Sequence, residues 1–125
     1  MNLEIIIIIG GIHSLFFALF HIGFWKIFNW KSELKKMNLQ NRAIIQISNL
    51  CLIYFFIFIT FFCFFFTKEL FSSLFGKVFL GGISLFWLTR TIEQFIFLPL
   101  NKLIVHGLTV LFVVGFIIFL LPVIL

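Results

Sequence analysis

Titratable side chains inside long apolar stretches are the first candidates for chemistry in this sequence. His21 and His106 lie in two such stretches, and Glu93 lies in a third. Two histidines on facing helices can hold a haem iron through its axial positions. A glutamate beside a histidine can act as general acid and base. These three residues define the chemistry that the chain would be able to support.

Two groups of polar residues accompany them, and each group would form one stripe on a helix: Arg42, Gln46 and Asn49 in the first, and Arg90, Glu93 and Gln94 in the second. At about 100° per residue, the first group covers about 60° of arc and the second about 100°. Ionisable groups inside a membrane helix usually face protein or water, because hydrocarbon penalises their charge. We therefore expect both stripes, with His21 and His106, to line a polar pocket.

The elements that would position these residues are membrane-spanning helices. Of the 125 residues, 63% are hydrophobic and only 10% are charged, whereas a soluble domain is about half apolar and one-quarter charged. A spanning helix takes about 20 residues. The sequence predicts an all-α, integral membrane bundle of four transmembrane helices, in a single domain covering residues 1–125, with spans at about 3–25, 43–66, 78–98 and 103–125.

Charge between these spans predicts their orientation. Residues 26–42 contain five basic side chains and one acidic one, a net charge of +4, whereas residues 67–77 carry a net charge of +1. Positive loops stay in the cytoplasm, so both termini and residues 67–77 should lie outside. The charge of +5 on the whole chain is then explained by orientation and not by a nucleic-acid partner. The expected location is the cell membrane, with the bacterial inner membrane favoured.

Depth along the helices places the pocket in the cytoplasmic half of the membrane. With a rise of about 1.5 Å per residue, His21 and His106 both lie about 10 Å to the cytoplasmic side of the midplane, and Asn49 and Glu93 lie about 7 Å to that side. Gly10, Ser14 and Ala18 repeat at a spacing that lets helices approach closely, and His21 projects on the same stripe.

Three functional hypotheses lead; a fourth, a proton or solute pathway, is disfavoured for a monomer because the outer half lacks titratable steps, and only an oligomer or a partner would complete it. The first is a structural, assembly or accessory membrane component, with the lipid bilayer, other membrane proteins or further copies of the chain as partners. The second is a b-type haem protein for electron transfer, with His21 and His106 as axial ligands. The third is a small enzyme acting on a lipid or quinone, with Glu93 and either histidine as acid and base. No ligand spacing in the sequence indicates a metal site.

The stretches 41–49 and 90–94 resemble the polar signatures of small bacterial four-helix membrane proteins. The resemblance attaches the chain to no named family. It implies no activity and no cofactor.

Overall fold

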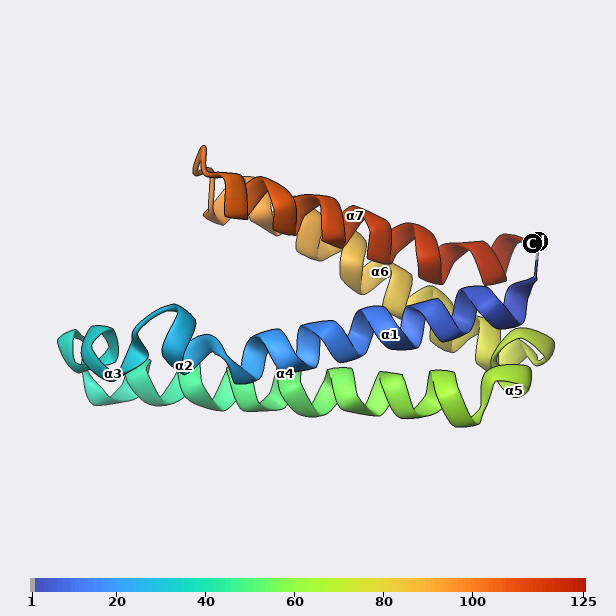
Figure 1. Ribbon diagram of the computed structural model, residues 1–125, viewed down its shortest axis with the longest axis horizontal. Helices are drawn as coiled ribbons and strands as arrows, with labels where there is room; N and C mark the ends of the chain where they lie inside the picture. Colours follow the sequence, from blue (N-terminus) through green and yellow to red (C-terminus); the bar gives the residue numbers. More distant parts are fainter. Residues whose placement is uncertain (1) are drawn as a thin grey trace. The chain divides into compact units, whose positions relative to one another are not determined.

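The computed structural model describes residues 2–125, and within that range it contains helices and no strand. Its elements are α1 (Leu3–Ile22), α2 (Phe24–Ile27), α3 (Trp30–Glu33), the short 3-10 helix η1 (Leu34–Lys36), α4 (Leu39–Phe65), α5 (Thr67–Ser72), α6 (Leu74–Phe97) and α7 (Leu103–Ile124) (Figure 1). The predicted all-helical class is confirmed.

Three of these helices, α1, α4 and α7, are long and apolar enough to cross a membrane. The fourth long helix, α6, has 24 residues but carries Lys77, Arg90 and Glu93, and it is not among the three. Residues 2–125 therefore form an all-helical chain with three candidate membrane spans.

The exposed surface of the chain is dominated by large apolar side chains. Leu103 is 89% exposed, and Phe97 and Phe75 are nearly as open. Water would penalise so much exposed apolar surface. Lipid chains impose no such penalty, so the surface matches the membrane location that the composition predicts.

The structure divides into two compact units, one formed by residues 2–10 with 62–125 and the other by Gly11–Phe61. Helices α1 and α4 each pass from one unit into the other. Each unit is described by itself below.

In the 11–61 unit, α1 packs antiparallel against α4. The rings of Phe17 and Phe56, both almost fully buried, have centroids 5.8 Å apart. Near the other end of the contact, the Thr60 hydroxyl donates to the Gly11 carbonyl at 3.2 Å and to the Phe56 carbonyl at 2.9 Å. Ser14 and Ala18 are also buried, as expected of small residues on a packing face.

Both helices of this unit have ends that differ from the predicted spans. The first span was expected to reach residue 25, but α1 ends at Ile22. There the amide of Gly23 donates to the carbonyls of both Leu19 and Phe20 at 3.1 Å, which tightens the last turn before α2 begins. Helix α4 begins before residue 43, because the side-chain oxygen of Asn38 accepts from the Asn41 amide at 2.9 Å and caps its first turn.

In the other unit, α6 and α7 form an antiparallel hairpin (Figure 1). The rings of Trp87 and Phe112 stack at 5.6 Å, and the Ser84 hydroxyl donates to the Phe116 carbonyl at 3.0 Å. The beginning of α1 also belongs to this unit. A side chain at Gly10 would place its Cβ 3.0 Å from the Phe119 ring, so this glycine permits a close approach between α1 and α7.

Residues 67–77, expected as a loop, are mostly helical. Helix α5 fills Thr67–Ser72, and α6 starts at Leu74. Between them, the Ser73 hydroxyl accepts from the Gly76 amide at 2.9 Å and donates to the Glu69 carbonyl at 2.6 Å. One hydroxyl thus caps the start of α6 and bonds the end of α5, which makes a sharp turn without a long loop.

Candidate functional site

A short pair of polar contacts joins α1 to α4 in the 11–61 unit. His21 Nδ1 lies 2.7 Å from Asn49 Oδ1, and Asn49 Nδ2 donates to the His21 carbonyl at 2.9 Å. Asn49 is buried, and His21 is half-buried. Since the amide oxygen is an acceptor, the ring presents Nδ1–H to it, which places the lone pair of the neutral imidazole on Nε2.

The second bond of this pair completes a helix end. His21 lies in the last turn of α1, where carbonyl groups lie beyond the reach of the helix's own donors. The Asn49 amide supplies a donor to that carbonyl from α4. One side chain therefore satisfies both the ring and the backbone of residue 21.

A second polar contact lies about one helical turn from the first, after His21 in the sequence and before Asn49. The indole Nε1–H of Trp25 donates to Gln46 Oε1 at 3.1 Å, and Gln46 Nε2 donates to the Arg42 carbonyl at 3.2 Å. The Gln46 carboxamide therefore uses both its acceptor and its donor side. The side chains of Gln46 and Asn49 are thus engaged by hydrogen bonds, and Arg42 takes part through its backbone carbonyl.

Aromatic rings surround the His21 imidazole. Its centroid lies 4.2 Å from that of Phe24 and 5.4 Å from that of Phe56. The Phe20 ring approaches it nearly at right angles. This environment holds the imidazole in one orientation against Asn49.

On α6, Arg90 lies three residues before Glu93, but its nearest described partner is an aromatic ring on α7. The guanidinium carbon lies 4.6 Å from the centroid of the Phe112 ring, in cation–π geometry. Glu93 is exposed. In the described part of the chain, the ion pair found is Lys36–Glu33, at 3.3 Å and on the surface.

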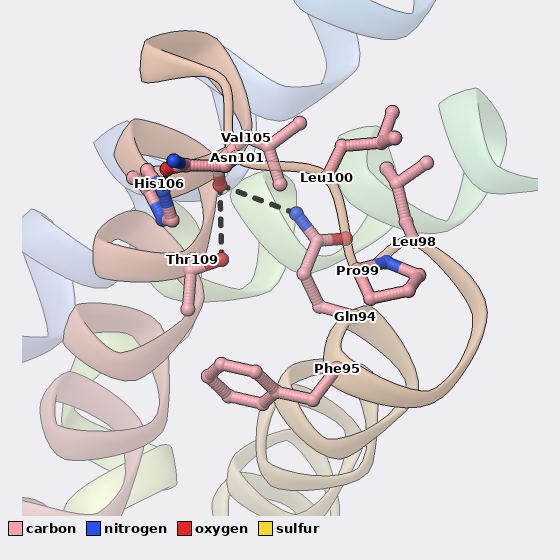
Figure 2. A pocket seen from close by; sticks show the side chains of 9 residues that line it. All are labelled: Gln94, Phe95, Leu98, Pro99, Leu100, Asn101, Val105, His106 and Thr109. Atoms are coloured by element: carbon pink, nitrogen blue, oxygen red, sulfur yellow. Dashed lines mark hydrogen bonds between the residues drawn. The ribbon is translucent and has the colours of Figure 1, made fainter.

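A cavity of about 260 Å³ lies at the turn between α6 and α7 (Figure 2). Its apolar walls come from Phe95, Leu98, Pro99, Leu100 and Val105. Its polar lining comes from Gln94, Asn101, His106 and Thr109. No carboxylate, ammonium or guanidinium is part of this lining.

Gln94 is the most buried polar residue of the cavity, with 2% of its surface exposed. Its Nε2 donates to the Val105 carbonyl at 3.3 Å, and the Thr109 hydroxyl donates to the same carbonyl at 2.9 Å (Figure 2). Gln94 Oε1 is buried and has no hydrogen-bond partner. The cavity wall therefore contains an acceptor that lacks a donor.

His106 lies at the exposed side of this cavity. Its Nε2 is 2.8 Å from Asn101 Oδ1, so the ring donates Nε2–H to the amide and keeps its lone pair on Nδ1. Asn101 precedes α7, and the contact closes the turn between the two helices.

The predicted site residues are divided between the two units. His21, Arg42, Gln46 and Asn49 belong to the 11–61 unit. Arg90, Glu93, Gln94 and His106 belong to the other. Within them, the structure brings His21 to Asn49, and it brings Gln94 and His106 to one cavity. Glu93 lines neither place.

The histidines differ in how well they fit axial haem ligation. In His21 the nitrogen bonded to Asn49 is Nδ1, an arrangement in which Nε2 would be the ligating atom. In His106 the Nε2 is already bonded to Asn101, so coordination through that atom would break the contact that closes the turn. Within residues 2–125, no three His, Cys, Asp or Glu side chains gather closely enough to hold a metal ion.

Two residues of these contacts were not identified from the sequence. Trp25 is not among the predicted site residues, but its indole N–H bonds Gln46. Asn101 is not among them either, and its side-chain amide engages His106. The available signal was proximity in the sequence, since Trp25 follows His21 by four residues and Asn101 precedes His106 by five.

The chain matches no protein-family model, no curated protein and no solved structure.

Proposed function

We propose that this chain is a small structural, assembly or accessory component of a cell membrane, crossing the bilayer with four helices. The observation that carries the proposal is the use of polar side chains for contacts between helices. His21 with Asn49, and Trp25 with Gln46, are joined by hydrogen bonds. Polar side chains that hydrogen-bond each other hold helices together. Few of their polar atoms are then left to bind or convert a substrate.

The proposed topology has both termini outside and residues 26–42 in the cytoplasm. The net charge of +4 in that segment supports this orientation. In the unit that contains both chain ends, Gly10 lies against Phe119. The start of α1 and the end of α7 thus lie at the same end of that unit, as an even number of crossings requires.

Cysteine labelling with a membrane-impermeant maleimide tests this topology. In a background with Cys51 and Cys63 replaced by alanine, Ser32→Cys should react only after the cells are permeabilised. Ser72→Cys should react in intact cells, because residues 67–77 would face outward. Labelling of Ser32→Cys in intact cells would contradict the proposed orientation.

The cause of the orientation is tested by removing its charge. Changing Lys31, Lys35 and Lys36 to glutamine leaves the 26–42 segment with a net charge of about +1, equal to that of residues 67–77. The labelling pattern should then become mixed. An unchanged pattern would show that these lysines do not set the topology.

An absorption spectrum of the chain in mild detergent, oxidised and then reduced with dithionite, tests the accessory role against electron transfer. The accessory role predicts no Soret band and no α or β band from haem-replete cells. A Soret band that disappears in His21→Ala and His106→Ala would instead establish a b-type cytochrome.

The accessory role also predicts an assembly in native membranes. Gentle solubilisation followed by native electrophoresis should place the chain in a defined complex well above its own mass of 14.7 kDa plus detergent. A chain that migrates and crosslinks only as a monomer would contradict the role.

A further inference from the structure

We propose that the cavity at the α6–α7 turn binds a neutral single-ring phenol or hydroquinone whose hydroxyl donates to Gln94 Oε1. This ligand site goes beyond the accessory role and does not depend on it. The argument rests on the unpaired acceptor, the lining of the cavity and its size.

The unpaired acceptor requires a donor. Gln94 Nε2 is committed to the Val105 carbonyl at 3.3 Å, so the carboxamide is held in one orientation. Figure 2 shows Oε1 on the opposite side of that carboxamide, toward the Pro99 turn. The residue is 2% exposed and Oε1 has no partner. Buried acceptors in folded proteins are normally paired, so a bound hydroxyl would remove an unfavourable feature of this site.

The lining favours a neutral ligand. It contains no charged side chain to pair with an ion, and burying an unpaired charge is strongly unfavourable. Of the other polar groups in the lining, two offer acceptors, because the Thr109 hydroxyl already donates to Val105 and His106 keeps its lone pair on Nδ1, while Asn101 Nδ2 is a donor. A hydroxyl donor fits these groups better than a carbonyl acceptor does.

The walls and the volume favour one ring. Phe95, Pro99 and Leu100 provide apolar surface around the carboxamide, and an aromatic ring can pack on such surface. The volume of about 260 Å³ is slightly below that of pockets for drug-sized ligands, which hold about 300–1,000 Å³. A phenolic hydroxyl on a single ring satisfies both the walls and the acceptor.

Ligand binding to the full chain in mild detergent tests the proposal. Under anaerobic conditions, hydroquinone should raise the unfolding temperature in a saturable way. Its dimethyl ether, 1,4-dimethoxybenzene, keeps the ring but has no donor, and its affinity should be lower by about tenfold. Equal affinity of the two compounds, or no binding of hydroquinone, would overturn the proposal even if no variant is available.

Two variants locate the binding site. Gln94→Met keeps a similar volume but lacks the acceptor, so it should abolish the preference for hydroquinone over its ether. Gln40→Met makes the same chemical change at an exposed position on α4 and should leave the preference intact. A preference that survives in Gln94→Met would overturn the assignment of the acceptor.

The ring could reach the cavity from water or from the membrane. Comparing hydroquinone with a decyl-substituted hydroquinone distinguishes these sources. Tighter binding of the decyl compound, with its own dimethyl ether as the reference, would identify a membrane quinol. Tighter binding of the unsubstituted ring would identify a soluble phenol, and either result supports the same contact with Gln94.

Discussion

Gly76→Ala should lower the free energy of unfolding by about 3 kcal/mol, the upper end of the usual cost of overpacking. Gly76 is buried in the first turn of α6. A Cβ there would collide with the backbone of α5, at the Leu70 Cα and at the carbonyl oxygens of Glu69 and Leu70. A side chain can rotate away from such a collision, but a backbone cannot. The α5–α6 turn would have to open, which would also strain the Ser73 hydroxyl contacts on both sides.

Gly81→Ala is the matched control, since it makes the same change in the same helix. A Cβ at Gly81 meets nothing within 4 Å, so the variant should be neutral or slightly stabilising through the higher helix propensity of alanine. Denaturation of both variants with SDS in mixed micelles, followed by circular dichroism, measures the difference. Equal stability of the two variants would show that α5 and α6 do not approach each other as described.

The helices themselves were predictable because a membrane leaves the chain few alternatives. Backbone groups in hydrocarbon must be satisfied within the segment, so long apolar stretches become helices almost regardless of their detailed sequence. The ends were harder to predict. They depend on single contacts, such as the Asn38 cap of α4 and the Ser73 hydroxyl between α5 and α6, and these contacts compete with continued helix at small differences in energy.

The candidate site was predictable only in part, for a geometric reason. Periodicity gives the face of a helix on which a residue lies, and rise gives its depth. Helix face and depth together predicted that His21 and Asn49 could meet. They do not identify the neighbouring helix, so the contact of Arg90 with Phe112 on α7 could not be predicted. Whether Gln94 Oε1 finds a hydrogen-bond donor likewise depends on how α7 packs against α6.

Asn49→Leu should cost about 2–4 kcal/mol of stability, because it removes two hydrogen bonds and leaves two groups of residue 21 unpaired. Asn49 Oδ1 accepts from the His21 ring at 2.7 Å, and its Nδ2 donates to the His21 carbonyl at 2.9 Å. Leucine has a similar volume, so packing is largely kept. Asn41→Leu, at an exposed position of the same helix, should change stability by less than about 0.5 kcal/mol.

The double variant His21→Phe/Asn49→Leu separates the two bonds. Phenylalanine removes the ring N–H that Asn49→Leu would leave unpaired, so the double variant should recover about 1 kcal/mol relative to the sum of the single changes. It cannot recover the bond to the backbone carbonyl, which remains at the end of α1 whatever side chain residue 21 carries. A coupling near zero would mean that the ring contact contributes nothing. Full recovery would mean that the carbonyl at the end of α1 does not need the donor from α4.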